Sequence, residues 1–400
     1  MAKQSLLPAP RDSGGAIGYL VTGIRRYLHM PDPSILYVLM GAVAGNLMDG
    51  YPVWLMLVGP PSDGKTELLN SLLGISGMHE LANISNESAF LSATTQKERA
   101  KDATGGILRQ VGDHGGVVMN DFTSVLGLDN KTLGVILSVF RESYSGRWTR
   151  HVGVDGGRQI RWVGKVAFFG GVTGEIDRHQ QINAALGERW IYYRMGANEV
   201  VTYEKARRAL LNAGRPVWRE ELRDLVASFF AGLDLWFGES EGRRDLTDQE
   251  ANKIIRLATV AARCRSAVVR DAYTKEIMGV RETEAGTRLA TILGQLLVGM
   301  EVIGVEERER WRLVGKVGLD SMPKIRRAIV DGVLSHGREG VTTTELAAAT
   351  GASKSVVDRA VEDLEVHGVV VGEVREDRKR WVVFTEGEGG AGEELRRWRV

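Results

Sequence analysis

Eight consecutive residues of this chain have the types and spacing of a phosphate-binding loop: Gly59-Pro60-Pro61-Ser62-Asp63-Gly64-Lys65-Thr66. They follow the apolar run at 53–58 and precede a segment of helical spacing that starts at Glu67. In a strand, loop and helix of this kind, backbone N–H groups and the positive helix end face a bound phosphate. Lys65 would reach the β- and γ-phosphate oxygens, and the Thr66 hydroxyl would bind Mg²⁺. Residues 59–67 are therefore predicted to bind a nucleoside triphosphate.

A nucleoside triphosphatase also needs a carboxylate at the end of a second buried strand, to hold Mg²⁺ and orient water. The apolar run 116–119 is followed directly by Asn120 and Asp121. We predict that Asp121 takes this role. The usual pair is Asp-Glu, so with Asn120 in first place the division between metal ligand and water activator stays open. Glu142 is either a displaced base or a solvated helix residue.

Two further polar residues are candidates for the hydrolytic site. Thr173 follows the apolar strand at 166–169, where a side chain would lie beside the γ-phosphate and act as a sensor. The alternative is a threonine that simply closes a strand. Arg189 precedes the apolar run 190–194 and is a candidate arginine finger acting across a subunit interface, a role worth roughly 10³–10⁵ in rate where such fingers have been measured. Arg178 and Arg194 are its rivals.

Composition limits the remaining classes of protein. The chain has 400 residues and a formal net charge of +1, so any binding to nucleic acid must come from local patches. The one cysteine, Cys264, excludes an intrachain disulfide and has the apolar helical surroundings of a buried thiol. The longest apolar stretch, 35–48, is too short to span a bilayer. We therefore expect a soluble, cytoplasmic protein.

The pattern of elements predicts an α/β protein with five parts. Residues 1–51 form a helical extension, with helices at 17–28 and 34–47 after a disordered start. Residues 52–200 form a parallel-sheet core, with strands at 53–58, 80–84, 116–119, 165–169 and 190–194. Residues 201–318 read as a nearly all-helical lid, 319–385 as a winged helix-turn-helix, and 386–400 as a flexible tail.

A basic hairpin is predicted between Asp121 and Thr173. The segment 147–165 has β-compatible runs on either side of Asp155-Gly156-Gly157, with five basic residues and one acidic residue. Its tryptophans, Trp148 and Trp162, either stack on bases or anchor the hairpin to the core. Its basic residues either contact nucleic-acid phosphates, which we favour, or form a solvated face. They are Arg147, Arg150, Arg158, Arg161 and Lys165.

The winged helix is predicted from three helix patterns and a basic hairpin. Thr342 and Glu345 match a capping box, and Ser353 is placed to cap the third helix. DNA contact is expected from outward cations of the third helix and the wing: Lys354, Arg359, Arg378 and Lys379. Residues 319–400 carry 13 basic and 15 acidic side chains, so a protein-docking role remains the alternative.

These landmarks, in this order, resemble AAA+ ATPases over 52–317. The hairpin just before the strand that ends at Thr173 is similar to the clade with minichromosome maintenance helicases and phage superfamily-three helicases. Residues 251–258 resemble that group's lid helix, although Gln249 stands where its sensor-two arginine would be and Arg256 is only a substitute candidate. The run 53–61, together with Asn120-Asp121-Phe122-Thr123-Ser124 and Arg150-His151-Val152-Gly153, looks like P-loop proteins of phages and mobile elements.

The resemblance implies ATP with Mg²⁺ as cofactors and a ring, most simply a hexamer, with nucleotide at subunit interfaces and hairpins lining a central pore. The first hypothesis is an ATP-driven DNA helicase or translocase of a replication system of the phage type. Single-stranded DNA would pass through the pore, and duplex DNA would contact the winged helix. The second is an ATP-dependent initiator, helicase loader or transcription regulator acting as a switch. The third is an NTP sensor whose winged helix binds another protein.

Overall fold

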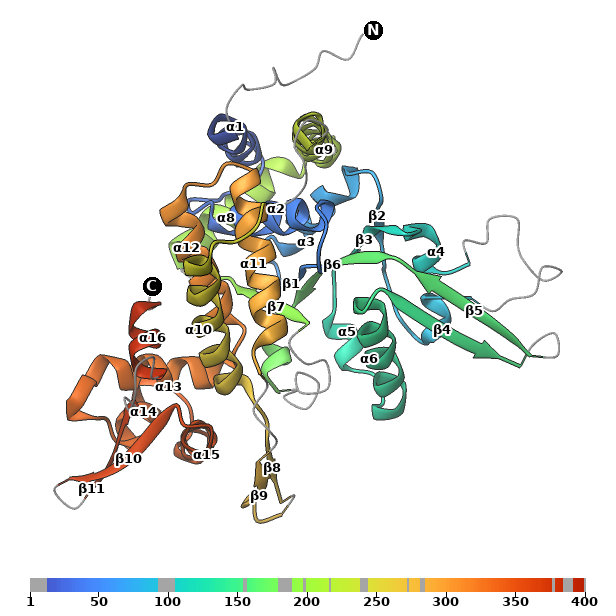
Figure 1. The fold of residues 1–400 in the computed structure, drawn as a ribbon. Coiled ribbons are helices and arrows are strands. Elements are labelled where there is room, and N and C mark those ends of the chain that lie inside the picture. The colour runs from blue at the N-terminus through green and yellow to red at the C-terminus, as the bar shows by residue number, and fades with distance from the viewer. Residues whose placement is uncertain are drawn as a thin grey trace, which may run out of the picture. The chain divides into compact units, whose positions relative to one another are not determined.

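The chain folds into two compact units. The first comprises Met1–Arg178, Tyr193–Arg244 and Gln295–Arg310, and the second comprises His179–Tyr192, Asp245–Gly294 and Trp311–Val400. The fold is known from a computed structural model (Figure 1). It describes residues 13–92, 105–153, 157–178, 189–196, 199–215, 217–237, 244–271, 273–280, 285–375, 378–383 and 391–398.

A five-stranded parallel sheet has the order β2-β3-β6-β1-β7. β1 pairs with β6 from Trp54 opposite Phe168 to Val58 opposite Val172, and β3 pairs with β6 on its other side. Because the strands are parallel, their carboxyl ends meet at one edge of the sheet, where ligands of open α/β sheets bind. The bounds are β1 (Trp54–Val58), β2 (Met78–Glu80), β3 (His114–Met119), β6 (Lys165–Val172) and β7 (Trp190–Arg194).

Helices of the first unit approach one another closely at glycines. α2 (Ser34–Leu47) is buried almost all round, and it packs against α11 (Thr287–Val302). A Cβ atom on Gly299 would lie 2.1 Å from the carbonyl oxygen of Gly41, so only glycine permits this helix separation. The other helices here are α1 (Ser13–Arg25), α3 (Lys65–Ser71), α4 (Ile107–Val111), α5 (Thr123–Leu126), α6 (Asn130–Tyr144), α8 (Glu199–Asn212) and α9 (Trp218–Phe237).

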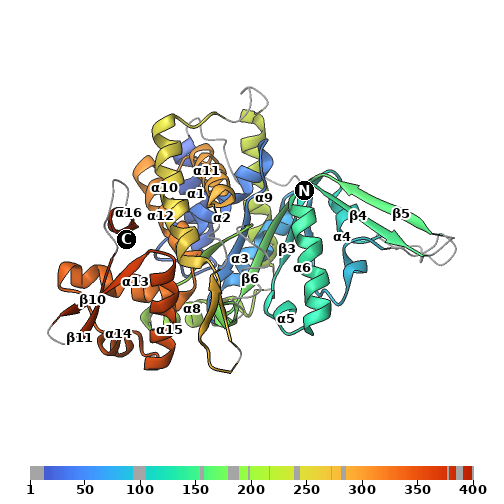
Figure 2. The ribbon, with the colours of Figure 1, turned by 60° about the horizontal axis from the view of Figure 1, so that its bottom comes forward.

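An aromatic cluster fixes α6 to the sheet. Trp54 of β1 makes edge-on contacts with Phe140 and Tyr144, at centroid distances of 5.8 Å and 5.2 Å. Its indole Nε1 donates a hydrogen bond to the Val166 carbonyl at 2.7 Å. The antiparallel hairpin of β4 (Arg147–Val152) and β5 (Arg158–Val163) follows α6 and extends away from the sheet (Figure 2).

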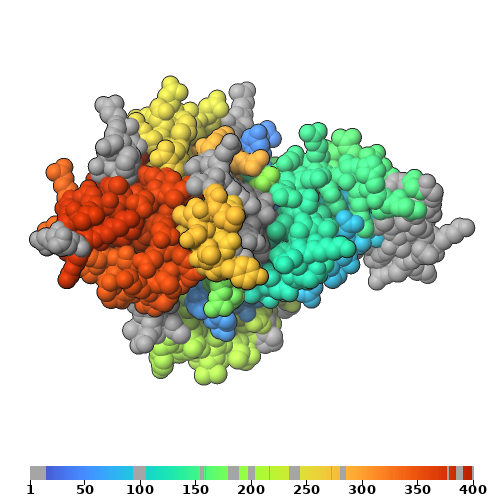
Figure 3. Space-filling model, turned by 90° about the horizontal axis from the view of Figure 1, so that it is seen from below, coloured from blue at the N-terminus to red at the C-terminus, as the bar shows by residue number. Residues whose placement is uncertain are grey.

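The second unit ends in a winged helix-turn-helix. It consists of α13 (Lys324–His336), α14 (Thr343–Thr350), α15 (Lys354–Val366) and the antiparallel strands β10 (Val370–Arg375) and β11 (Arg378–Val383). These residues form a continuous body beside a second hairpin, β8 (Val268–Arg270) and β9 (Ile277–Val280) (Figure 3). The unit also contains α10 (Asp248–Arg265), most of α12 (Glu307–Asp320) and α16 (Ala391–Arg397).

Several predicted elements are confirmed, and others are corrected. β1, β3 and β7 lie where expected, and α2 coincides with the predicted helix at 34–47. The predicted position of the second strand, 80–84, is wrong, because β2 covers Met78–Glu80 and ends where the predicted strand begins. The first helix, predicted at 17–28, begins four residues earlier and ends three residues earlier, as α1. The start of the chain was predicted to be disordered, and residues 1–12 of that segment lie outside the described part.

The lid and the tail differ most from expectation. The segment 201–318 is not nearly all helix, since β8 and β9 interrupt it. The tail is not flexible throughout, because Leu395 of α16 and Trp398, the residue after this helix, are buried. Residues 384–390 lie outside the described part. Cys264 is buried as predicted, and burial raises the pKa of its thiol to about 12. No described helix is long and apolar enough to cross a membrane.

Candidate functional site

The loop between β1 and α3 is a tight turn at the position of the predicted phosphate-binding loop. Ser62 and Gly64 both have positive φ, at +62° and +85°, and α3 begins directly after them at Lys65. Glycine adopts positive φ without steric cost, whereas serine does so only with backbone strain. Strained residues of this kind occur most often at functional sites. Gly59 N donates to the Val172 carbonyl at 3.1 Å, which ties the start of the loop to the end of β6.

Lys65 is held inside this loop. Its side chain is buried, and its Nζ donates to the carbonyl oxygens of Gly59 at 2.7 Å and Pro60 at 2.6 Å. Burial lowers the pKa of Lys65, and the nearby Lys205 acts in the same direction, whereas Asp63 and Asp121 raise it. The fold therefore brings Asp121 near Lys65, although Lys65 begins α3 and Asp121 follows β3.

The ends of β3 and β6 bring Asp121 and Thr173 together. The carboxylate Oδ1 of Asp121 accepts from the backbone N of Thr123 at 3.0 Å. The Thr123 hydroxyl in turn accepts from the backbone N of Thr173 at 3.2 Å. Because β6 lies between β1 and β3, Thr173 stands between the phosphate-binding loop and the carboxylate, as a sensor would require.

The donors for Mg²⁺ are the hard oxygens that this ion prefers. The Thr66 hydroxyl and the Asp121 carboxylate belong to exposed residues, and they lie at the ends of adjoining elements at one sheet edge. Their chemistry fits a cation that is shared with phosphate oxygens. No cluster of three or more His, Cys, Asp or Glu side chains occurs among the described residues, so no all-protein metal cage is found there.

Asn120 does not point toward the same partners as Asp121. Its amide Nδ2 donates to Asn70 Oδ1 of α3 at 2.8 Å and to Glu80 Oε1 of β2 at 3.3 Å. It therefore links α3 to the edge strand. Asn70 and Glu80 are not among the residues predicted for this site, because no local motif connects Asn120 to positions 50 and 40 residues away.

A cavity of about 610 Å³ opens beside the phosphate-binding loop. Four segments line it: the loop and first turn of α3, the connection between α1 and α2, the end of β7 with the residues after it, and the region from α8 to the start of α9. Tyr27 and Trp218 stack at a centroid distance of 6.2 Å, and Arg219 lies over the Trp218 ring. Arg219 also forms an ion pair with Glu67 at 2.6 Å, which fixes α9 to α3.

The arginine-finger candidates differ in exposure. Arg189 is 9% exposed, so its side chain is largely enclosed by its own chain. Arg194 forms a two-bond ion pair with Asp177, at 2.7 Å and 2.8 Å. Arg178 is 78% exposed at the side chain and pairs with Glu175 at 3.0 Å. Of the three, Arg178 is the one presented to solvent.

The tryptophans of the β4–β5 hairpin serve as anchors. Trp148 and Trp162 are both buried, and Trp162 Nε1 donates to the Gly112 carbonyl at 2.6 Å. Trp148 makes an edge-on contact with Phe90 at 6.4 Å. Both tryptophans therefore anchor the hairpin to the core, which was the alternative to stacking on bases.

Two of the five basic hairpin residues, Arg150 and Lys165, form intramolecular contacts. Arg150 pairs with Glu87 at 2.8 Å and donates to the Leu91 carbonyl at 2.7 Å, with 15% of its side chain exposed. Lys165 Nζ donates to the Met48 carbonyl at 2.5 Å. Arg147 and Arg161 are exposed, and the Arg158 side chain and residues 154–156 lie outside the described part.

The winged helix forms as its sequence predicts. Thr342 and Glu345 make both hydrogen bonds of a capping box at the start of α14. Ser353 occupies the N-cap position of α15 but makes no capping hydrogen bond through its side chain, so that part of the prediction is wrong. Trp381 of β11 packs under the wing and donates to Thr343 Oγ1 at 3.2 Å.

Cations are available on the outside of this domain. Lys354 at the start of α15 and Arg378 and Lys379 in the wing are exposed. Arg359 is half-buried, and its Nε donates to the Ser355 carbonyl at 2.9 Å. Lys379 Nζ lies 4.1 Å from the Trp381 ring centroid and 3.4 Å from Glu365 Oε2. Lys354 and Arg378 are thus the cations best placed for a nucleic-acid phosphate.

Comparison with known proteins identifies one domain. Residues 332–373 match the IclR helix-turn-helix domain, which covers the end of α13, α14, α15 and the start of β10. Among curated proteins, none matches this sequence. A similar solved structure is titled "The A form apo structure of NrS-1 C terminal region-CTR"; it is 12% identical, with 95% of this chain and 78% of that chain covered. Its TM-score is 0.31, too low to support any conclusion about fold or function.

The C-terminal domain is therefore a helix-turn-helix, and this supports DNA binding by the chain. The match lies within the second unit and says nothing of the phosphate-binding loop. The core of the first unit is a mixed α/β structure around a five-stranded parallel sheet.

Proposed function

We propose that this chain is an Mg²⁺-dependent ATPase that acts on DNA, as a helicase or translocase working in a ring. The observation that carries the proposal is the meeting of Lys65, Asp121 and Thr173 at one edge of the parallel sheet. There the loop 59–66 borders a cavity of about 610 Å³. This arrangement suits a nucleoside triphosphate, with phosphates on the loop and a base toward the aromatic pair.

Each residue has a role that its position allows. Lys65 would bind phosphate oxygens in exchange for the two carbonyls that it now contacts. Thr66 and Asp121 would hold Mg²⁺, which neutralises charge on the phosphates when it is bound. Thr173, fixed through Thr123, would contact the terminal phosphate. An arginine from a neighbouring subunit would complete the site, and Arg178 is exposed enough for this while Arg189 would have to leave its buried position.

ATP, hexameric assembly and a replication role of the phage type rest on the AAA+ resemblance. The strand order supports that resemblance, since β6 lies between the strand of the phosphate-binding loop and the carboxylate strand. The β4–β5 hairpin enters β6 directly, as the pre-sensor hairpin of the clade does. We place the AAA+ core, with its lid and winged helix, as part of the same proposal.

A nucleotide-controlled DNA-binding switch is the second candidate. Two observations favour it: the helix-turn-helix match, and the internal use of Arg150 and Lys165, which leaves fewer hairpin cations for DNA in a pore. In this case the winged helix would read a duplex site through α15. Nucleotide binding would control when it does so.

ATP hydrolysis by the full chain separates the two candidates. The assay compares no DNA, single-stranded DNA and duplex DNA at two salt concentrations, with Lys65→Ala as the blank. A motor gives stimulation by single strands of any sequence that weakens steeply with salt, because phosphate contacts dominate. Hydrolysis that ignores single strands, with duplex binding lost in Lys354→Ala and Arg378→Ala, supports the switch. Unchanged nucleotide binding in Lys65→Ala refutes both.

A further inference from the structure

The phosphate-binding loop contains a carboxylate that is already paired with a lysine from elsewhere in the fold. Asp63 is nine-tenths buried, with 10% of its side chain exposed. Its Oδ1 accepts a hydrogen bond from Nζ of Lys205, which lies 142 positions later on α8. The same Nζ lies 3.4 Å from the Asp63 carbonyl oxygen. α8 thus places a second lysine on the loop that holds Lys65.

The pair is incomplete as a structural ion pair. Asp63 Oδ2 is buried and has no hydrogen-bond partner among the described residues. Buried acceptors of this kind are rare, and each is costly unless something else compensates it. Oδ2 lies near Gly59, since a Cβ on that glycine would come within 3.3 Å of it. The carboxylate therefore leans over the start of the loop, on which phosphates would sit.

Charge is gathered on one side of the cavity. Lys65 and Lys205 both line it, and the charge of Lys205 lowers the pKa of Lys65. Arg208, one turn after Lys205 on α8, lines it as well. Asp63 supplies the negative charge that the two lysines share. A polyphosphate entering this cavity brings more negative charge than Asp63 and would meet repulsion from that carboxylate.

We propose that Lys205 is a second phosphate-binding lysine of this site, and that Asp63 holds it in place until a nucleotide polyphosphate replaces the carboxylate. An ammonium has three donors, so Lys205 can move from Oδ1 to a phosphate oxygen with a small change in side-chain torsions. The exchange makes α8 responsive to the nucleotide. It rests on the proposed function, since both need a nucleotide on the loop 59–66.

A simpler role for Lys205 would be to brace the loop through Asp63 alone. The two roles differ in a variant that lacks the Asp63 charge. If Lys205 binds phosphate, it contributes to nucleotide affinity even when Asp63 is replaced by asparagine. If Lys205 acts only through Asp63, its removal has no further effect in that background. Additivity in a double-mutant cycle therefore decides between them.

The test measures the Kd of MgADP and MgATP for the full chain by isothermal titration calorimetry. The variants are D63N, K205M and D63N/K205M, and methionine keeps the aliphatic stem of Lys205. R207A is the matched control, because Arg207 lies on the same helix with 58% of its side chain exposed and does not line the cavity. Thermal unfolding midpoints check that each variant is folded.

We expect D63N to bind more tightly than the natural chain, because it frees Lys205 and removes the repulsion. Within the D63N background, K205M should raise Kd roughly tenfold or more, as loss of a charged hydrogen bond predicts. Equal affinities of D63N and D63N/K205M would overturn the proposal and leave Lys205 as a brace. An affinity of K205M equal to that of R207A would overturn it too.

Failure of this inference can be told from failure of the proposed function. Lys65→Ala is measured in the same series. If Lys65→Ala abolishes nucleotide binding while K205M has no effect in D63N, only the role of Lys205 is refuted. If Lys65→Ala binds nucleotide as well as the natural chain, the site itself is refuted.

Discussion

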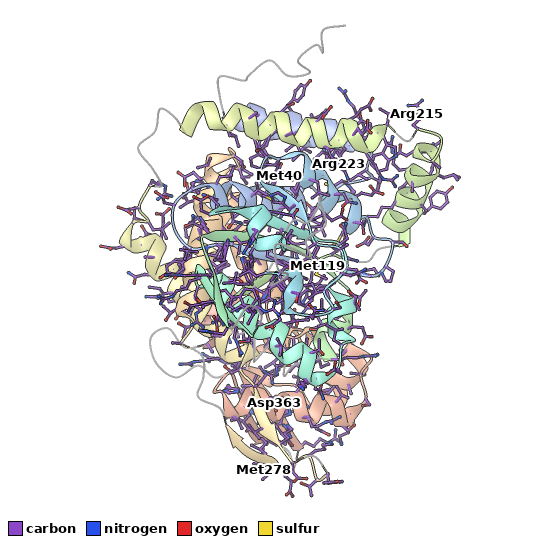
Figure 4. The ribbon with its side chains drawn as sticks, turned by 90° about the vertical axis from the view of Figure 1, so that its right-hand side faces the viewer. Met40, Met119, Arg215, Arg223, Met278 and Asp363 are labelled. Atoms are coloured by element: carbon purple, nitrogen blue, oxygen red, sulfur yellow. The ribbon has the colours of Figure 1, made fainter. Side chains whose placement is uncertain are left out.

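Asp363 of the winged helix lies between two arginines of other elements, and its removal should destabilise the second unit strongly. Its Oδ2 accepts from Arg326 at 2.7 Å, and its Oδ1 accepts from Arg270 of β8 at 2.6 Å. Arg326 is 1% exposed, and its other hydrogen bonds go to the carbonyls of Cys264 and Ser266. Figure 4 labels Asp363 in this domain. Asp363→Ala would leave the Arg326 guanidinium buried without a counter-charge.

The size of the effect follows from burial. Breaking a buried ion pair by removing one partner costs about 3–5 kcal/mol of unfolding free energy. For a unit of this size that is roughly 6–20 °C in thermal midpoint. The adjacent Glu362 also pairs with Arg270, at 3.0 Å, but 47% of its side chain is exposed. Glu362→Ala should therefore cost only about 0–1 kcal/mol.

Differential scanning calorimetry of the full chain tests this with Glu362→Ala as the matched control. The double variant Asp363→Ala/Arg326→Met should recover most of the loss, because an apolar replacement of a buried pair is often neutral. If Asp363→Ala lowers the midpoint no more than Glu362→Ala, then Arg326 does not depend on Asp363. The reasoning from burial would then be refuted.

Three further predictions concern the core, the helix crossing and pH. Trp162→Ala should cost about 3–5 kcal/mol in urea unfolding, because it empties a buried anchor, whereas Trp162→Phe should cost less. Gly299→Ala should destabilise by about 1–3 kcal/mol through its clash with Gly41, while Gly134→Ala, with open space around it, should stabilise by about 0.4–1 kcal/mol in the same assay. Burial lowers the pKa of His367, with Arg326 acting in the same direction, so its contribution to stability is full above about pH 6.5 and is lost as pH falls through the folded pKa. The thermal midpoint should therefore fall less between pH 7 and pH 5.5 in His367→Gln, and an equal fall would contradict this assignment.

Local patterns predicted the elements whose cause is local. The apolar run at 53–58 became β1, fully buried on both faces of the sheet, because a parallel strand needs little else to be recognised. The capping box of Thr342 and Glu345 marked the start of α14 to the residue. The loop 59–66 lies between β1 and α3, as its glycines and the flanking apolar and helical patterns predicted.

Elements without such signals were missed. The β8–β9 turn has Lys275 at φ +62° where a glycine or asparagine would have marked it, so the hairpin looked like part of a helical lid. β9 has the sequence Ile-Met-Gly-Val, in which the exposed position is the apolar Met278, labelled in Figure 4. The strand therefore lacks the alternation of apolar and polar residues by which a strand is recognised in sequence. α16 follows a Gly- and Glu-rich stretch, and only its docking reveals that Leu395 and Trp398 are core residues.

Charge patterns were the least reliable guide, because an arginine looks the same in sequence whether solvent or a carboxylate surrounds it. Arg150 was predicted to contact nucleic-acid phosphate, but its guanidinium pairs with Glu87, 63 positions away. Arg223, labelled in Figure 4, similarly donates from α9 to the Asn70 carbonyl of α3. Partners at such separations are set by tertiary packing, which single-sequence patterns do not contain.

Whether an arginine is exposed or paired within the chain also decides which part of this chain could bind DNA. The hairpin is held to the core by Trp148, Trp162 and Arg150, and among its described side chains Arg147 and Arg161 are the exposed arginines. So few exposed arginines limit the electrostatic gain that the hairpin can make on DNA, because that gain grows with the number of phosphates neutralised. Firm attachment to DNA would then fall to the winged helix. Motor and switch thus differ less in their parts than in whether the hairpin or the winged helix responds to the nucleotide.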